Sequence, residues 1–459
     1  MRISLLLLVF VCGSAWTSLV SAQVGSLNRS GSGARAAGMA DIFVAVSDDG
    51  TAASWNPAGL AQLTRPEGSL VGAVYARSAE LKGFHSPDHL ARFTERHTSF
   101  TTASPDFVSL ALPFTLLGRA VTVQGGWWRQ YDFAAHFKTE TFREALDPHT
   151  GPPALRLIHN EKVDGGIDVW SLAGAVKLTR RMALGVSVDL WRGEWMYDVT
   201  VLEQPWPSGP GTFVSNFERN RLRGNNWTLG MLLTYPRARV GVVYHAPFSA
   251  DFLARAEQRR PEGTLEADFD ARAHFDASVG AGVAFHPAPR WTVSVGLAWD
   301  PWSKSTAEGF PGQTGPVNLF DSLPQHRTST RDTLSAGVGL EYLWQRDGFI
   351  VPLRAGAALE PQGEMDVVRR DPRTIAVLAL GTGLNTNSVK LDAAVQYRFS
   401  HHAASASLSV ANILQGDKLR PDAYGMEHQA EWRVKVSAIF RLSEGQTLGE
   451  ILQRVFVGG

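Results

Sequence analysis

The chain has 459 residues, and its 44 Lys and Arg side chains balance 44 Asp and Glu side chains, so its formal net charge at pH 7 is zero. This balance provides no overall field that would attract nucleic acid or an anionic surface. A hydrophobic content of 44% with a mean hydropathy of −0.10 leaves two classes, a large secreted β protein or a transmembrane β-barrel, whose lipid-facing and lumen-facing residues alternate.

The first 22 residues have the pattern of a secretory leader. Arg2 is followed by an apolar run over residues 3–11 and by small residues up to Ala22, after which we expect cleavage. The apolar run is shorter than the roughly 18 to 20 residues that span a bilayer. Because Cys12 is the only cysteine, we expect the exported protein to contain no disulfide, no catalytic thiol and no cysteine-bound metal.

Residues 23–66 are rich in small side chains and show no alternation of apolar and polar residues. Asn56 and Pro57 form a turn within this segment, because proline fixes its own φ and disfavours the α conformation of the residue before it. A segment of this length that is exported and is not a strand needs a place in the fold. The lumen of a wide barrel can hold it, and we therefore expect residues 23–66 to form an N-terminal hatch, or plug.

From residue 67 onward the chain alternates apolar and polar side chains with a period of two, which predicts strands with one apolar and one wet face. Residues 388–400, 429–442 and 290–303 show the alternation most clearly. Eleven further runs lie near 68–77, 106–114, 119–134, 165–178, 182–202, 221–235, 238–254, 271–286, 331–345, 349–360 and 373–384. The sequence thus predicts fourteen strands.

The connections between these runs alternate in length. Short gaps follow the even-numbered runs, as at 115–118 and 236–237, and long polar segments follow most odd-numbered runs, as at 135–164 and 203–220. An up-and-down barrel has short turns at one side of a membrane and long loops at the other. We therefore predict an all-β fold, a 14-stranded antiparallel transmembrane β-barrel over residues 67–442 with the hatch in its lumen.

The third run contains Gly125 and Gly126 in its middle. Glycine weakens a strand and often marks a bulge or bend. Two interpretations stand for this pair: a kink that opens the wall, or an ordinary bend of a barrel strand.

Residues 443–459 continue beyond the last run. Thr447 and Glu450 form a capping-box pattern, and the apolar residues that surround them fall on one helical face. We expect a short periplasmic tail helix.

The segment SGSGARAAGMADIFVAVSDDGTAASWNPAGL resembles the N-terminal hatch of the FadL/TodX family of outer-membrane transporters for long-chain fatty acids and other hydrophobic compounds. Asn56, Pro57 and Ala58 match the Asn-Pro-Ala motif of that hatch. Residues 34–38 and 48–49 match the segments that precede the motif. The resemblance covers about thirty-five residues, and beyond them it rests on plug-first order and strand number.

This resemblance implies passive uptake of a hydrophobic small molecule, a fatty acid or a hydrocarbon, by a barrel in the outer membrane of a Gram-negative-type bacterium. It assigns the gate to Asn56, Pro57 and Ala58, and it implies a lateral exit into the outer-membrane lipid at a kink in the third strand, where Gly125 and Gly126 lie. We expect a monomer that uses no cofactor and binds no nucleic acid. An outer-membrane scaffold or secretion partner is the alternative, followed by an outer-membrane hydrolase.

Other chemistry has weaker support in the sequence. We expect no metal site, because His85, His89, His401 and His402 fall in expected external loops and a site needs ligands that converge. No Gly-x-Ser-x-Gly motif occurs, and no catalytic residue is assigned. Seven tryptophans are candidates for the interfacial girdles or the ligand path, namely Trp127, Trp128, Trp191, Trp195, Trp291, Trp299 and Trp302. Four basic residues are expected to face the lumen, namely Lys390, Arg398, Arg433 and Lys435.

Overall fold

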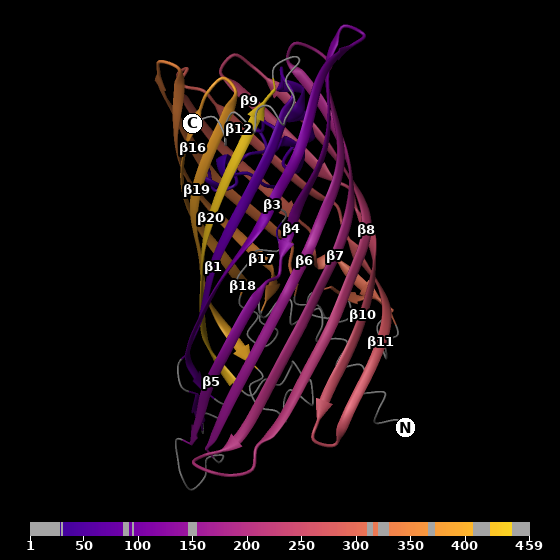
Figure 1. Cartoon of the computed structure of the whole chain (residues 1–459), viewed down its shortest axis with the longest axis vertical. Helices are drawn as coiled ribbons and strands as arrows, with labels where there is room; N and C mark the ends of the chain where they lie inside the picture. The colour runs from indigo at the N-terminus through magenta and orange to yellow at the C-terminus, as the bar shows by residue number, and fades with distance from the viewer. Residues whose placement is uncertain are drawn as a thin grey trace, which may run out of the picture.

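Figure 1 shows a computed structural model of the chain, in which a single sheet closes into a tall barrel. The structure describes residue 28 and residues 31–85, 91–93, 96–145, 154–309, 315–319, 330–365, 372–406 and 423–442. The expected leader (residues 1–22), the expected tail helix (within residues 443–459) and His89 lie outside the described residues. No helix in the described part of the chain is long and apolar enough to span a bilayer.

The described wall consists of fourteen antiparallel strands, so the predicted barrel is confirmed. Eight of them are β1 (Glu67–His85), β3 (Arg96–Leu116), β6 (Leu155–Lys177), β7 (Met182–Pro205), β8 (Thr212–Thr234), β13 (Trp291–Asp300), β16 (Thr333–Arg346) and β17 (Phe349–Met365). Three more are β18 (Pro372–Asn385), β19 (Val389–Ala406) and β20 (Ala423–Arg441). The sheet closes because β1 pairs with β3 on one side and with β20 on the other.

The remaining three wall strands each consist of two parts in sequence. They are β4 (Arg119–Asp132) with β5 (Ala135–Ala145), β9 (Ala238–His245) with β10 (Phe248–Arg260), and β11 (Gly263–Phe275) with β12 (Ser278–Phe285). Short strands β2 (Ala91–Phe93), β14 (Thr306–Glu308) and β15 (Val317–Asn318) lie beside the wall, as does the 3-10 helix η3 (Trp302–Lys304). Before β1 the chain forms α2 (Ala34–Ala37) and the 3-10 helices η1 (Ala52–Ser54) and η2 (Pro57–Gln62).

Several strands extend beyond their predicted limits, always at the end with the long connections. β3 begins at Arg96 although the sequence predicts its start near residue 106, and β8 begins at Thr212 although the sequence predicts residue 221. The expected loops 135–164 and 203–220, and the connection expected between the first two runs, are therefore partly strand. The sequence missed these parts because they lack a regular apolar face. In β8, for example, the inward Asn220 and the outward Arg219 are both polar, although the backbone ladder continues.

The short connections at the other end are tight turns, as expected. Between β3 and β4, Leu117 and Gly118 both have positive φ angles, of 52° and 74°. Two such residues in succession are typical of a type I′ hairpin turn, whose twist matches that of the strands it joins. This end, at the top of Figure 1, corresponds to the periplasmic side of a transmembrane barrel.

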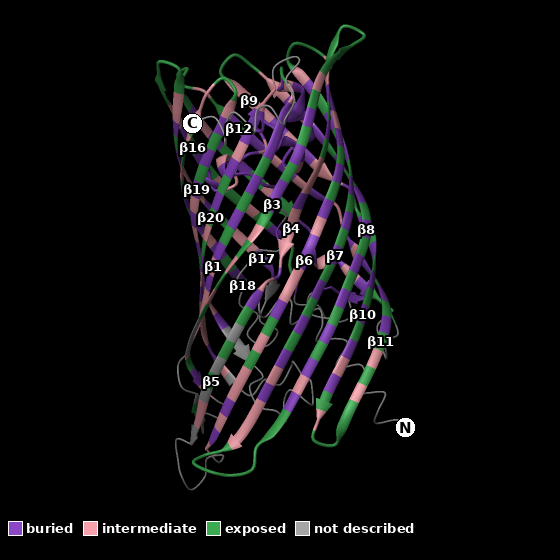
Figure 2. Cartoon of the chain, in the orientation of Figure 1, coloured by how far each residue is buried: buried purple, intermediate pink, exposed green. Residues whose placement is uncertain are grey.

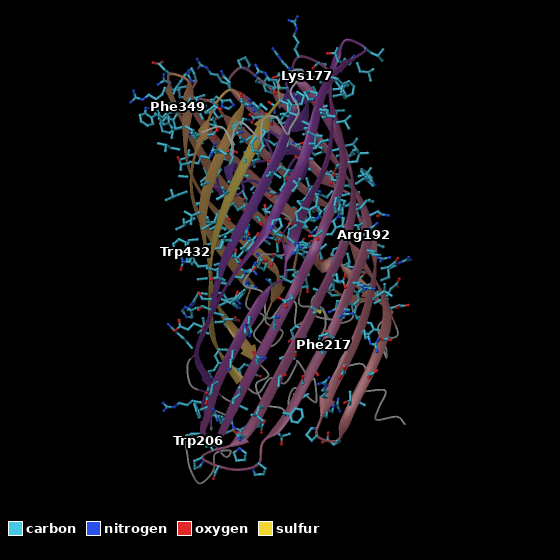
Figure 3. All side chains as sticks on the ribbon, in the orientation of Figure 1. Lys177, Arg192, Trp206, Phe217, Phe349 and Trp432 are labelled. Atoms are coloured by element: carbon cyan, nitrogen blue, oxygen red, sulfur yellow. The ribbon has the colours of Figure 1, made fainter. Side chains whose placement is uncertain are left out.

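Burial alternates residue by residue along the strands, as Figure 2 shows most clearly on β6, β7 and β8. The outward side chains near the short turns form an apolar band. On β7 the band runs from Leu184 to Leu190, and it includes Leu380 on β18 and Trp432 on β20, which points away from the barrel in Figure 3. Counted from the half-buried Met182 at the start of β7, the outward apolar run to Leu190 spans nine residues, which fits the about 9 to 11 residues that a tilted strand needs to cross a bilayer.

The seven candidate tryptophans divide between the two faces of the wall. Trp291 and Trp299 are exposed on the outer face, and Trp127 lies beside the outward Trp170 with ring centroids 6.5 Å apart. The other four, Trp128, Trp191, Trp195 and Trp302, are buried inside. The sequence did not separate the outward tryptophans from the inward ones.

The apolar band makes a direct prediction for Leu380. We expect Leu380→Arg to lower the free energy of unfolding in phospholipid vesicles by about 2–4 kcal/mol, because it places a charge near the bilayer midplane. The matched control is Leu384→Arg, closer to the turn, where the cost falls to about 0–1 kcal/mol. Denaturant titrations in vesicles measure both values, and equal costs at the two positions would contradict the proposed membrane level.

Candidate functional site

Residues 31–63, here called the inner segment, contact the wall on all sides. Its helix η2 lies against β4, β6, β7 and β8, whereas α2 lies against β18, β19 and β20. Between these two contacts, the chain passes close to Gly241 on β9 and to Gly339 and Gly356 on β16 and β17. A segment that touches wall strands around the whole circumference lies within the lumen. In Figure 1 it is the indigo part of the chain near the short-turn end.

The residues Asn56, Pro57 and Ala58 lie where the inner segment meets β7 and β8. The Asn56 side chain is fully buried, and its Oδ1 accepts a hydrogen bond from the backbone nitrogen of Ala58 at 3.1 Å, which caps η2. Its Nδ2 donates to the carbonyl of Val44 and to the carbonyl of Met231 in β8, both at 3.1 Å. Pro57 occupies the first position of η2, where its missing N–H costs no helical hydrogen bond. Asn56 thus joins two parts of the inner segment to the wall.

Glycines in the wall make this close approach possible. A Cβ on Gly230 would lie 2.1 Å from Oδ1 of Asn56, and a Cβ on Gly185 would lie 2.3 Å from the carbonyl carbon of Pro57. Any side chain at these positions would collide with the Asn56 turn. Gly185 on β7 and Gly230 on β8 are therefore part of the site. The sequence of these strands did not indicate that the two glycines contact the Asn56 turn.

A second attachment surrounds Gly50. Its carbonyl accepts hydrogen bonds from Ser109 Oγ at 2.8 Å and from Gln124 Nε2 at 2.6 Å, and its nitrogen donates to the Glu67 carboxylate at 2.9 Å. These three side chains belong to β3, β4 and β1. The backbone of the inner segment is thus also held by β1, β3 and β4, which follow on the wall directly after the strands that contact α2.

Ion pairs inside the lumen, partly buried from solvent, connect the inner segment to the remaining wall. Arg35 pairs with Asp48 within the segment and with Glu341 of β16, whose carboxylate oxygen lies 2.8 Å from the guanidinium. Asp48 in turn accepts from Arg239 of β9 at 2.9 Å. Burial alone would raise the pKa of Asp48, but Arg35 and Arg239 hold it well below its usual range. Asp48 therefore carries its charge at neutral pH and links the segment to the wall.

Toward the long-connection end, the lumen contains an aromatic chamber. Its members are inward-facing aromatic residues of β4 to β12 and of the β4–β5 junction: Trp128, Phe133, Trp191, Trp195, Phe248, Phe252, Phe269 and Phe275. The rings pack against each other, with centroid separations of 5.0 Å for Trp191 and Phe248 and 5.2 Å for Phe133 and Trp195. The sequence contained the signal, since Trp191, Trp195, Phe248 and Phe252 recur at even spacing, but it did not show that these positions point inward.

A cavity of about 140 Å³ lies between the chamber and the inner segment. Phe43 and Trp55 of the inner segment line it on one side, and Trp128 and Trp191 line it on the other. Polar residues of the wall, among them Arg398 and Arg433, lie at its edge. The lining of the cavity therefore combines aromatic rings with charged side chains.

The basic side chains of the lumen, including the two arginines that line the cavity, already have carboxylate partners. Arg398 binds Glu360 at 2.5 Å, and Arg433 binds Glu431 at 2.9 Å, while Lys435 binds Asp106 at 2.9 Å. Together with Lys390, which lies 3.7 Å from Glu67, these are the four basic residues expected to face the lumen. Lys390, Arg398 and Lys435 are buried, and Arg433 is partly buried. An anionic ligand would have to displace one of these carboxylates.

The third wall strand is interrupted beyond the predicted glycines. Gly125 and Gly126 pair in register with β3 on one side and β6 on the other. The β3–β4 pairing ends at Trp128, the β4–β6 register shifts between Arg129 and Tyr131, and β4 stops before Phe133 turns inward. The carbonyl of Ala134 accepts a hydrogen bond from Arg77 Nη1 at 2.7 Å. The interruption therefore lies beside the aromatic chamber.

Gly125 itself faces outward. Together with Leu110, Trp127, Trp170 and Leu172 it lines an apolar hollow on the lipid-facing side of the wall. The glycine leaves space there because no side chain covers its backbone.

The histidines considered for metal binding do not converge. His401 lies against His428 of β20, and His402, which follows it on the strand, lies 3.6 Å from Glu427. His85 contacts the carbonyl of Gly83. Among the described residues, no three His, Asp or Glu side chains are grouped in a way that could hold a metal ion.

Comparison with known proteins identifies the fold. No family model and no curated protein matches the sequence. Among solved structures, a FadL homologue of Pseudomonas aeruginosa aligns over 91% of this chain and 99% of its own length, with a TM-score of 0.61 and 14% identity. The Ralstonia pickettii toluene transporter TbuX gives a TM-score of 0.54 at 14% identity, over 91% of this chain and 100% of its own. The Pseudomonas putida toluene transporter TodX gives 0.53 at 14% identity, over 85% and 93%. The barrel and its apolar band place the chain in the outer membrane of a Gram-negative bacterium.

The contact between Gly230 and Asn56 generates a test of the site. We expect Gly230→Ala to force the Asn56 side chain away from Val44 and Met231, at a cost of about 1–3 kcal/mol for the unpaired polar groups, and so to loosen the inner segment. In planar bilayers the variant should show more frequent ion-conducting openings than the parent. The control is Gly174→Ala on β6, where a Cβ would meet nothing within 4 Å. The same conductance in both variants would show that Asn56 does not hold the segment.

Proposed function

We propose that this chain, which has the fold of the FadL/TodX family, carries hydrophobic small molecules passively across the outer membrane. The observation that supports this most is the aromatic chamber, which lies on the extracellular side of the inner segment. The inner segment fills the lumen without being part of the wall. Burial of apolar surface gives about 25 cal/mol per Å², so a chamber of packed rings can take an apolar molecule from water without an energy source. In this view, β1 and β16 to β20, which contribute ion pairs to the lumen, hold the inner segment in place and do not bind the ligand.

In this proposal the inner segment is the hatch, and residues 23–66 form its domain. The Asn56, Pro57 and Ala58 turn is the gate, because it combines the capping of η2 with the hydrogen bond to β8. Movement of this turn away from Gly185 and Gly230 would open a path through the lumen from the chamber toward the periplasmic end. The neighbouring ion pairs of Arg35 and Asp48 would keep the rest of the segment in the lumen during that movement.

We further propose a lateral exit between β3 and the strand formed by β4 and β5. The lost pairing beyond Trp128, with Phe133 turned into the chamber, provides a gap in the ladder where the chamber meets the wall. The apolar hollow over Gly125 lies next to it on the lipid side. The glycines would thus belong to the lipid-side end of the exit, and the interruption would form its chamber-side end.

Two features favour a neutral ligand of the size of a single aromatic ring over a long-chain fatty acid. A cavity of about 150 Å³ in a protein interior holds one benzene molecule, and the cavity of about 140 Å³ found here is of that size. In addition, Arg398 and Arg433 are already neutralised by Glu360 and Glu431. A fatty-acid carboxylate would have to break one of these ion pairs.

Uptake measurements test the ligand class. In cells that lack their own channels for hydrophobic compounds and contain a toluene-oxidising enzyme, we expect the parent protein to raise toluene consumption several-fold at low concentration, and uptake of labelled oleate to change little. Trp191→Ala should reduce the toluene rate, because it removes a ring that lines the cavity. Trp299→Ala, on the outer face, is the matched control. Oleate uptake above that of toluene would reverse the ligand assignment, and uptake of neither would favour a scaffold.

A reversible cross-link tests the gate separately. A Cβ on Gly50 would lie 3.5 Å from Cβ of Ser69, within the range of a disulfide, and the only native cysteine is Cys12. We expect Gly50→Cys with Ser69→Cys to abolish toluene uptake when oxidised and to recover it on reduction, because the bond ties the inner segment to β1. Each single cysteine variant serves as a control. Undiminished uptake by the fully cross-linked protein would refute a gate that depends on movement of this segment.

A further inference from the structure

A row of charged side chains marks the extracellular edge of the apolar band. On β7 the outward residues are apolar up to Leu190, and the next outward residue is Arg192. On β8 the outward Trp227 is followed, two positions further from the short turn each time, by Asn225 and then by Arg223. Arg192 therefore leaves the wall just beyond the lipid level, and Figure 3 shows it at the outer margin of the barrel.

The strand register aligns six charged residues across this edge. Neighbouring strands pair Arg129 with Asp168, Asp168 with Arg192, Arg192 with Arg223, Arg223 with Asp251, and Asp251 with Arg272. Positive and negative charges alternate along this row with one exception. Arg192 and Arg223 lie directly opposite each other, so two like charges are adjacent.

The carboxylates of the row are paired with other arginines. Asp168 binds Arg129, and Asp251 lies 3.4 Å from Arg272. Among the described residues, no carboxylate lies within 4.0 Å of either Arg192 or Arg223. Nη1 of Arg192 donates to the carbonyls of Trp191 at 2.7 Å and Gly224 at 3.1 Å, which fixes the side chain and leaves its other nitrogens for a further acceptor.

Like charges placed directly opposite each other on a sheet are destabilising. An anion between them would remove this repulsion, and phosphate suits two guanidinium groups because each can bind it with paired N–H donors. Below the pair, Leu190 and Trp227 expose apolar side chains at the lipid level. The surface thus combines an anion site with an apolar surface directly beneath it, which is the arrangement of a phosphorylated lipid.

We propose that Arg192 and Arg223 bind a phosphate group of lipid A, the phosphorylated glycolipid of the outer leaflet. The acyl chains would lie along Leu190 and Trp227, and the phosphate would lie between the two guanidinium groups. Arg221, in the next row of β8, lies 3.5 Å from Glu194, so this next row adds no net charge and the free positive charge is at Arg192 and Arg223. The bound lipid would fix the depth of the barrel at this face of β7 and β8.

Lipid binding to the detergent-solubilised, folded barrel tests this proposal by native mass spectrometry. We expect bisphosphorylated lipid A to bind the parent at least about tenfold more tightly than the variant with Arg192→Gln and Arg223→Gln, a difference of about 1.4 kcal/mol. The control variant carries Arg255→Gln and Arg259→Gln, which remove two exposed arginines of β10 that have carboxylate neighbours. It should bind lipid A as the parent does. Lipid A without phosphates should bind parent and double variant equally.

The free energy of unfolding of the barrel gives an independent test, because the effect of Arg223→Gln on it should change sign when lipid A is present. In vesicles without lipid A, Arg223→Gln should leave the barrel as stable as the parent or more stable, because it removes repulsion between like charges. In vesicles with lipid A, the same variant should be less stable than the parent. Lower stability in both vesicles would show that Arg223 has an internal structural role and overturn the proposal. Equal lipid A binding by parent and double variant, or displacement of lipid A by equimolar inorganic phosphate, would overturn it as well.

Discussion

Every backbone N–H and C=O at the lipid level must find a partner within the protein, and the closed antiparallel ladder of β1 to β20 is the solution in this chain. Closure has a second consequence. Alternate side chains must point into an interior that fourteen strands make too wide for side chains alone to fill. The inner segment and the aromatic chamber both answer this requirement, at different heights of the same lumen.

The interior is divided along its circumference as well as along its height. Strands β4 to β12 contribute the rings of the chamber, whereas β1 and β16 to β20 contribute buried ion pairs such as Arg77 with Glu431 and Arg354 with Glu341. Isolated buried charges would be far too costly, but each of these has a partner at hydrogen-bond distance. Such a paired wall is rigid and offers little to an incoming anion, and the chamber opposite it offers apolar surface. This asymmetry gives the lumen its chemical preference.

The period-two alternation predicted the number of strands, their order and the short turns, because a membrane strand must keep one apolar face. It underestimated β3 and β8, whose outer ends lack a regular apolar face although the ladder continues. It left open whether Gly125 and Gly126 form a kink or an ordinary bend, and it did not indicate the break in the ladder beyond Trp128, where packing turns Phe133 inward. The pair of Arg192 and Arg223 could not be predicted from the sequence for another reason. Its neighbours depend on the register between β7 and β8, and a net charge of zero conceals a local excess.

The charged row at Arg192 divides the barrel into two parts that stand in different solvents. Trp195, Phe252 and Phe269 lie further along the strands than this row, so much of the chamber is above the lipid. There the wall has water outside and rings inside, as in a soluble β-barrel, and the hydrophobic effect stabilises it. On the periplasmic side of the row, the outer face of the wall contacts lipid hydrocarbon. There, burial of apolar side chains away from water no longer stabilises the wall. The two halves of one continuous sheet should therefore respond differently to cooling and to denaturant, and the outer half should loosen first.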